Sequence, residues 1–586
     1  MVRRLMSGRA WLVMVAVLAV SATGLRASAD DTPVADAAMR GDVAAVRTLL
    51  QQGADVNAAQ GDGMTALHWA AVEGNLPLAQ MLIYAGADTH ATTRIGGYTA
   101  LDIAAKDGHA DVVQALLKGG ADPKTVNAYG TTPLMLAAAA GSVPAVTALI
   151  EAGADVNARE RVHGETALML AAAYDRTGAM QALLAHGADW KPTSTVLDWA
   201  TLPKNDPRLP HFHFPGAQAA KAKGPAAHGA AAHEKGQPAT AGVGQKKPAN
   251  PFAGRTPYWK LVGTQGGLSA LLFAARQGYS DAAMVLLNHG ADVNEVDAGD
   301  HTSPLLIAII NGHYDLAEQL LAHGADPNLA EANGVTPLYA VINCQWSSKV
   351  DYPQPTAYEQ QATSYLTLMK DLLAHGANPN ARLKEKVWYS GYNFDLSGLD
   401  ESGATPFWRA AYAADVDAMK LLVAHGADPT IWTRKTQQSS GFYRTFSKVD
   451  HSGLKPVPVG GPDIPPLLAA AGEGYGWSLT SNQHRFAAAG PLAAVKYLVD
   501  VLHVDVNARD ADGNTALHNA AARGDNAMIL FLVSKGADIA AVNRNGQSVA
   551  DMANGPVQRV NPYPETIALV QRLGGKLLHK CLSCGG

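Results

Sequence analysis

The chain has 586 residues, of which 47% are hydrophobic and 17% are charged. A chain of this length exceeds one compact core, so it contains several domains or an extended repeat array. The formal net charge of −5 gives no electrostatic reason to expect nucleic acid or an anionic membrane surface as a partner. Because there are only three cysteines, stability must come from packing rather than from a disulfide framework.

The N-terminus has the features of a secretory signal peptide. Arginines precede an apolar run at residues 11–20, which has about half the length of a membrane-spanning helix. Ala27-Ser28-Ala29 fits the small-x-small cleavage rule, so residues 1–29 are predicted to be removed by a cut after Ala29. The mature protein is then expected to be periplasmic or secreted, with no stable membrane insertion. An uncleaved membrane anchor is the alternative.

Two short motifs recur in phase along the chain. Gly-Ala-Asp first recurs at intervals of 33 or 34 residues. Its copies, the eighth with Asn in place of Asp, begin at Gly53, Gly86, Gly120, Gly153, Gly187, Gly290, Gly324, Gly376, Gly426 and Gly536. The second motif is Thr-Pro/Ala-Leu, as in Thr65-Ala66-Leu67-His68, Thr132-Pro133-Leu134 and Thr515-Ala516-Leu517-His518.

Together these motifs resemble the ankyrin repeat, whose period is about 33 residues and whose signature is T-P-L-H-x-A. The resemblance implies a mainly α ankyrin-repeat solenoid, in which each unit has two short helices and a β-hairpin finger. We expect about twelve units in two arrays, at residues 30–200 and 264–578, with polar repeats at the ends. The motif histidines His68 and His518 are expected to make structural hydrogen bonds to neighbouring loops.

The regular period breaks between Gly187 and Gly290. Residues 195–200 look like the first helix of a further repeat whose partner helix is missing. Residues 201–263 are rich in Ala, Gly, Pro, Lys and His, with little that could form a core. We predict that this low-complexity segment is a disordered, flexible linker between the two arrays.

Four shorter inserts interrupt the second array. Those near 344–362 and 474–489 are predicted between the two helices of a repeat, and those near 384–402 and 432–462 in finger positions. Aromatic residues on such loops are enriched at binding hot spots, which favours a recognition surface. The predicted protein-binding residues are Trp346, Trp388, Tyr389, Tyr392, Phe394, Trp408 and Trp432. Alternatively, the inserts fold back and use these rings as local cores.

The C-terminal tail, residues 579–586, contains a C-x-x-C motif formed by Cys581 and Cys584. No His follows it, so covalent haem attachment is not expected, and three nearby ligands fall short of a zinc site. A small disulfide or a disordered tail is the plain expectation, and a redox or metal role is the alternative. The sequence has no G-x-S-x-G, H-E-x-x-H, Walker or dinucleotide motif, so we predict no catalytic residues, no metal and no cofactor.

The function predicted from these features is a non-catalytic protein–protein interaction scaffold. It would bind through ankyrin fingers, the concave helix face and the aromatic insert loops. Two alternatives remain, a redox- or metal-linked accessory protein acting through Cys581 and Cys584, and a secreted effector that binds a host protein. Ala- and Gly-rich, Lys-poor composition together with the signal segment suggests a bacterial source.

Overall fold

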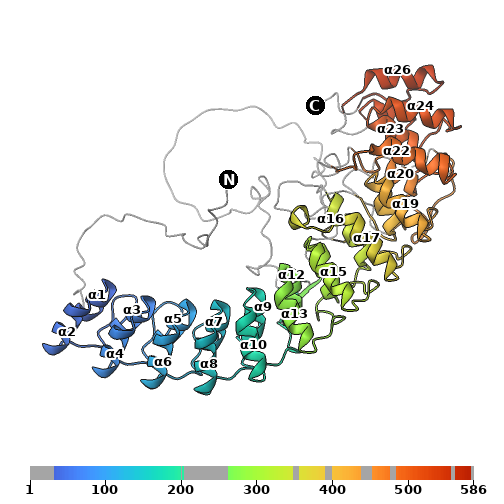
Figure 1. Cartoon of the computed structure of the whole chain (residues 1–586). Helices are drawn as coiled ribbons and strands as arrows, with labels where there is room; N and C mark the ends of the chain where they lie inside the picture. The colour runs from blue at the N-terminus through green and yellow to red at the C-terminus, as the bar shows by residue number, and fades with distance from the viewer. Residues whose placement is uncertain are drawn as a thin grey trace, which may run out of the picture. The chain divides into compact units, whose positions relative to one another are not determined.

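A computed structural model of the whole chain gives the fold (Figure 1). The residues that it describes are 32–199, 201–202, 262–347, 356–387, 389, 399–436, 450, 452–475, 484–555 and 561–581. The predicted signal peptide and nearly all of the predicted linker lie outside these residues. The chain divides into two compact units, Met1–Asp122 and Pro123–Gly586, which we describe separately.

The first unit contains three helix pairs. The first helices of the pairs pack against one another in the order α1, α3, α5, and each packs against the second helix of its own pair. The pairs are α1 (Pro33–Met39) with α2 (Val43–Gln51), α3 (Ala66–Val72) with α4 (Leu76–Tyr84), and α5 (Ala100–Asp107) with α6 (Ala110–Lys118).

The second unit continues the same pattern with longer connections. Its first helices are α7 (Pro133–Ala140), α9 (Ala167–Ala173), α12 (Ala270–Gln277), α14 (Pro304–Ile310), α16 (Pro337–Trp346), α18 (Pro406–Tyr412), α20 (Pro466–Ala470), α23 (Ala516–Ala522) and α25 (Val549–Ala553). Their partners are α8 (Val143–Glu151), α10 (Thr177–Ala185), α13 (Ser280–Asn288), α15 (Tyr314–Ala322), α17 (Tyr365–Ala374), α19 (Val416–Ala424), α22 (Gly490–Lys496), α24 (Asn526–Ser534) and α26 (Pro564–Arg572). A 3-10 turn, η1 (Ala357–Gln360), precedes α17, and a π-helical segment, η2 (Tyr497–Val501), extends α22.

Over the described residues the helices therefore form twelve pairs, which confirms the predicted number of repeat units. Within that part of the chain, no helix is both long and apolar enough to cross a membrane.

The break after Gly187 is bridged by a finger rather than by a further helix. Strand β1 (Val196–Asp198) pairs antiparallel with β2 (Thr264–Gly266), with Leu197 opposite Gln265. The prediction of a helix at residues 195–200 was therefore wrong. Helix α9 packs on α12 and α10 packs on α13, so the two predicted arrays stack directly on each other. The low-complexity segment is consequently an insertion within one finger.

Residue choice at the helix ends explains why each unit begins and ends where it does. Thr132 and Thr405 each accept a hydrogen bond from the backbone N–H three residues on, and Pro occupies the first helical position after each of them. After the second helix, Gly376 takes a φ of 88°, in the left-handed region that side-chain-bearing residues avoid. The preceding His375 donates its Nδ1–H to the carbonyl of Asp371 at 2.8 Å, which satisfies a terminal acceptor.

An asparagine ladder joins successive repeats. In each rung, an Asn side chain donates to the carbonyl of the Gly-Ala-Asp glycine in the next repeat and accepts from the backbone N–H two residues after that glycine. The rungs are made by Asn57, Asn157, Asn294, Asn328, Asn380 and Asn507. The ladder fixes the spacing of the fingers, because both hydrogen bonds require one separation between neighbours.

The motif histidines bond to the next repeat, as the resemblance implied. His68 Nδ1 accepts from the backbone N–H of Thr65 at 3.1 Å, so its Nε2 carries the proton and donates to the carbonyl of Tyr98 at 3.1 Å. His518 makes the same contacts with Thr515 and Gln547. Burial lowers the pKa of His518 to about 4.

Candidate binding surface

Two of the predicted binding residues belong to the core. Trp408 has no exposed surface and Tyr389 is 2% exposed, so neither ring is available to a partner. Trp408 stands three residues after its capping Thr405, the position that His68 occupies in its own repeat. Its Nε1–H donates to the carbonyl of Ile464 at 3.0 Å, just before the next repeat begins, as His68 does to Tyr98. Trp408 thus substitutes for the motif histidine, and its assignment to a recognition surface is corrected.

Trp346 ends α16 and is half-buried. Its Nε1–H donates to Asp415 Oδ2 at 2.8 Å, and the Tyr365 hydroxyl donates to the same oxygen at 2.9 Å. Arg485 lies 5.9 Å from the centre of the Trp346 ring. The Nε1–H and much of the ring of Trp346 therefore contact other parts of the chain. Trp346 packs locally at the turn edge, by which we mean the side of the array where the first helix of each repeat turns into the second.

The described end of the 474–489 insert also packs back onto the array. His484 Nε2 bonds the carbonyl of Tyr412 at 2.8 Å, and its ring lies 4.1 Å from the Tyr412 ring centre. Burial, together with the charge of Arg409, lowers the pKa of His484 to about 3, so the imidazole is neutral. Arg485 Nη1 donates to the Tyr358 hydroxyl at 3.1 Å, across 127 residues of sequence. For this insert the described contacts favour local packing over recognition.

The described part of the 432–462 insert reaches along the finger tips. The Arg544 guanidinium forms an ion pair with Asp450 and donates to the carbonyls of Leu454, at 3.1 Å, and Lys455, at 2.6 Å. Hydrogen bonds from the Ser452 hydroxyl and backbone N–H, with a smaller contribution from the Arg544 guanidinium, lower the pKa of Asp450 to about 2. Residues 450 and 452–455 therefore lie against a later finger of the same array.

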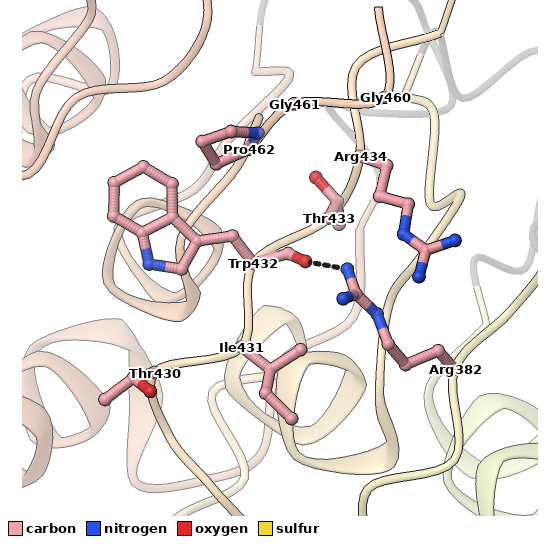
Figure 2. Close-up of a pocket in the computed structure, with 9 residues that line it drawn as sticks. All are labelled: Arg382, Thr430, Ile431, Trp432, Thr433, Arg434, Gly460, Gly461 and Pro462. Atoms are coloured by element: carbon pink, nitrogen blue, oxygen red, sulfur yellow. Dashed lines mark hydrogen bonds between the residues drawn. The ribbon is translucent and has the colours of Figure 1, made fainter.

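Trp432 lines a pocket of about 520 Å³ between two successive fingers. Figure 2 shows its indole beside Pro462 on one side of the Thr433 backbone, and the guanidinium groups of Arg382 and Arg434 on the other. The remaining lining residues are Thr430, Ile431, Gly460 and Gly461. The pocket thus combines an apolar wall with a cationic wall.

The cationic wall is held by the finger backbones. Arg382 Nε donates to the carbonyl of Gly403 at 2.9 Å, and its Nη2 donates to the carbonyl of Trp432 at 2.6 Å, which ties one finger to the next. Burial, with a contribution from the neighbouring Arg434 charge, lowers the pKa of Arg382. A Cβ on Gly403 would lie 2.8 Å from Arg434 Cγ and 2.9 Å from Arg382 Nη2, so the two arginines need glycine there.

Neither Arg382 nor Arg434 is among the residues predicted from the sequence, although the sequence carries a pattern that indicates the role of Arg382. An Asn-Ala-Arg triplet occurs at residues 157–159 and 380–382, each time after a Gly-Ala-Asp-type motif, and at 507–509, after His503-Val504-Asp505 in the corresponding position. In each case the arginine donates to a carbonyl of the next finger, at Thr193, Trp432 and Val542. The triplet therefore indicates an arginine that hydrogen-bonds one finger to the next.

Three predicted binding residues, Trp388, Tyr392 and Phe394, lie outside the described residues, as does Cys584. Cys581 is disulfide-bonded. Cys344 is buried and is not part of a disulfide.

One group within the described ranges has the spacing of metal ligands, formed by Glu160, His163 and Glu165 with ligand atoms within 4.8 Å of one another. Glu160 already accepts from the backbone N–H groups of Val162 and His163, which shape the turn of that finger. A carboxylate used in this way serves the loop conformation.

The paired helices, the capped turns and the laddered fingers define a helical-repeat protein of the kind that binds other proteins. Family models agree along the chain: ankyrin repeats in three copies match residues 101–194 and 257–348, ankyrin repeats in many copies match 34–83, 67–117 and 483–533, and a single ankyrin repeat matches 402–434. The chain belongs to the ankyrin repeat family. These repeats are protein-interaction modules, and the family is typically non-catalytic.

A curated relative resembles a small part of the chain. A stretch of 54 residues is 46% identical to the Ankyrin repeat and LEM domain-containing protein 1 homolog of Caenorhabditis elegans. The match spans 9% of this chain and 8% of the length of that protein. It supports the repeat assignment and carries nothing about a particular partner.

Proposed function

We propose that this protein is an exported, non-catalytic scaffold that binds a protein partner through the fingers of its second array. The observation that carries the proposal is the pocket in Figure 2, which is lined by the half-buried Trp432 and by two arginines at the finger edge. Trp and Arg are the side chains most enriched at binding hot spots, because each buries a large area and offers directed hydrogen bonds. Among the predicted aromatic anchors that are described, Trp432 lines a pocket, whereas Trp408 and Tyr389 are buried.

The proposed contact region is smaller than the recognition surface that the sequence indicates. Trp346 and the described part of the 474–489 insert pack at the turn edge, so they act by shaping the array. We therefore infer that the partner contacts the finger edge at residues 430–434 and 460–462. Binding there needs no cofactor, since recognition depends on shape, apolar area and charge.

Export is the second element of the proposal and is supported by the residue pattern of positions 1–29. A partner in the periplasm or outside the cell follows from it. A host protein as the partner, which would make the chain an effector, is the narrower form of the same idea.

The test uses the full chain, purified from its native source with partners attached, in three forms: unsubstituted, Trp432→Ala and Trp190→Ala. Trp190 lies in an earlier finger and is also half-buried, so it serves as the matched control. We expect an identified partner to bind the unsubstituted chain and Trp190→Ala equally, and Trp432→Ala at least tenfold more weakly. Equal binding by all three forms, measured with the purified partner, would contradict the proposal.

A further inference from the structure

Two places on the finger edge of the second array have the same construction. The first joins the 375–405 finger to the 425–465 finger through Arg382, Gly403 and Arg434. The second joins the 502–515 finger to the 535–548 finger through Arg509, Gly513 and Arg544. Each residue of one set occupies the same position in its repeat as its counterpart in the other.

The hydrogen bonds of the two places correspond. Arg382 donates to the carbonyls of Gly403 and Trp432, and Arg509 donates to those of Gly513 and Val542. The backbone N–H of Arg434 donates to the carbonyl of Ser402 at 2.7 Å, and that of Arg544 donates to the carbonyl of Asp512 at 2.8 Å. The backbones that carry Arg434 and Arg544 are thus placed equivalently relative to the preceding finger.

One of the two places is filled by the chain itself. Arg544 binds the Asp450 carboxylate and the carbonyls of Leu454 and Lys455. A Cβ on Gly513 would lie 3.0 Å from Leu454 Cδ1, so the leucine covers that glycine. The occupant is therefore a short segment with an acidic residue followed four positions later by leucine. The finger before the 502–515 finger supplies it.

The other place has no such occupant within the described residues. Arg434 is exposed, and there its guanidinium has neither a hydrogen-bond nor an ion-pair partner. The finger that would have to supply an equivalent segment, residues 323–336, is short and carries no insert. Trp432 occupies the repeat position that Val542 has at the filled place, and it lines the pocket.

We propose that the Arg382–Arg434 pocket binds a segment of a partner protein with the chemistry of residues 450–455, in which an aspartate pairs with Arg434 and a leucine follows four residues later. The inference rests on the proposed function and names the partner's chemistry. Charge complementarity supports it, because two neighbouring guanidinium groups attract a carboxylate, and the planar arginine fork matches its geometry.

The test measures binding of the hexapeptide Asp-His-Ser-Gly-Leu-Lys, which copies residues 450–455, to the full chain by ligand-observed NMR. We expect saturable binding, with magnetisation transferred from the protein to the leucine methyl groups of the peptide. Replacing the peptide's aspartate by asparagine should weaken it about tenfold. Arg434→Gln should weaken it at least tenfold, Arg434→Lys should have an intermediate effect because the charge remains without the fork, and Arg544→Gln should leave it within twofold.

Three outcomes would overturn the inference. The first is no binding to the unsubstituted chain. The second is binding that is lost in Arg544→Gln but kept in Arg434→Gln, since the peptide would then be exchanging with the internal segment. The third concerns residues 395–399, Asp-Leu-Ser-Gly-Leu, which repeat the pattern and lie almost entirely outside the described residues. If Asp395→Asn strengthens peptide binding tenfold or more, the chain's own segment fills the pocket.

Failure of the peptide is distinguishable from failure of the scaffold function. If the peptide does not bind but Trp432→Ala still weakens the purified partner, the pocket has another occupant and the proposed function stands. If the peptide binds as described and the partner is indifferent to Trp432→Ala, the pocket chemistry stands and the proposed function fails.

Discussion

The Asn328 side chain donates to the carbonyl of Gly376 at 2.9 Å although 48 residues separate the two. In an uninterrupted part of the array, Asn294 makes the same bond to Gly324 across 30 residues. The extra residues of the 344–362 insert therefore leave the spacing of the stacked repeats unchanged. Inserts are tolerated because the ladder and the helix contacts, rather than the connection length, set the repeat geometry.

Removing one rung should measurably weaken the array. Asn328→Ala deletes the bond to Gly376 and the bond accepted from the Asn378 N–H, so we expect a loss of about 1–2 kcal/mol in the free energy of unfolding. Thr430→Ala is the matched control, because Thr430 occupies the same position in its repeat but bonds only within its own turn, to Asp428. Urea unfolding checks both. A loss no larger for Asn328→Ala than for Thr430→Ala would show that the rung contributes nothing.

Release of the segment at residues 450–455 should follow removal of its arginine. In Arg544→Gln the ion pair to Asp450 and the bonds to the Leu454 and Lys455 carbonyls are lost. We expect amide hydrogen exchange in residues 452–455 to become at least tenfold faster, with little change in the neighbouring helices. Arg94→Gln, at the same finger position of an earlier repeat, should leave this exchange unaltered. Unchanged exchange in Arg544→Gln would mean that other contacts hold the segment.

Glu331 should make stability depend on pH. Burial, with Asp300 and Asp297 nearby, raises its pKa to about 8. The folded state then binds more protons than the unfolded state between about pH 4.5 and pH 8, so the contribution of this group to stability falls as pH rises through that window. Glu331→Gln keeps the shape without the charge, and we expect it to be more stable than the unsubstituted chain by about 2–4 kcal/mol at pH 8, with much less difference at pH 5.

Urea midpoints at the two pH values check this prediction. Glu565→Gln, at an exposed position of α26, is the control and should change stability little at either pH. If Glu331→Gln alters stability equally at pH 5 and pH 8, the carboxyl does not titrate in this window.

The N-terminal segment gives a prediction about the mature chain. If residues 1–29 are a signal peptide cut after Ala29, the protein isolated from its native source should begin at Asp30. Intact mass and N-terminal sequencing decide the matter, with Ala29→Leu expected to slow processing because the small-residue rule is broken. A mature chain that still begins at Met1 would favour the uncleaved anchor.

The repeat fold could be predicted from the sequence because its determinants are local. Thr at the cap and Gly after the second helix each act within a few residues, and their common period fixes the stack. Trp408 was assigned to the surface for its residue type, although its register, three residues after Thr405, already placed it in the motif-histidine position.

Other features depend on tertiary contacts that no local pattern specifies. Tyr389 lies in an insert, and its burial depends on where that insert settles. The pairing of residues 196–198 with 264–266 closes a finger across more than sixty residues of sequence. The run at residues 195–200 is too short for its hydrophobic period to distinguish a helix from a strand. The Arg382–Arg434 pocket requires two fingers at once, so neither motif alone predicts it.

Partner binding by the fingers of the second array is tested most directly by site-specific photo-crosslinking in the native source, with a photoreactive phenylalanine analogue at position 432. Position 530 is the control, since Leu530 is 50% exposed on α24 and lies outside the pocket. We expect a covalent adduct to a protein partner at position 432, reduced by added Asp-His-Ser-Gly-Leu-Lys peptide, and none at position 530. An adduct at position 530 without one at position 432 would contradict the claim that the fingers of the second array bind the partner.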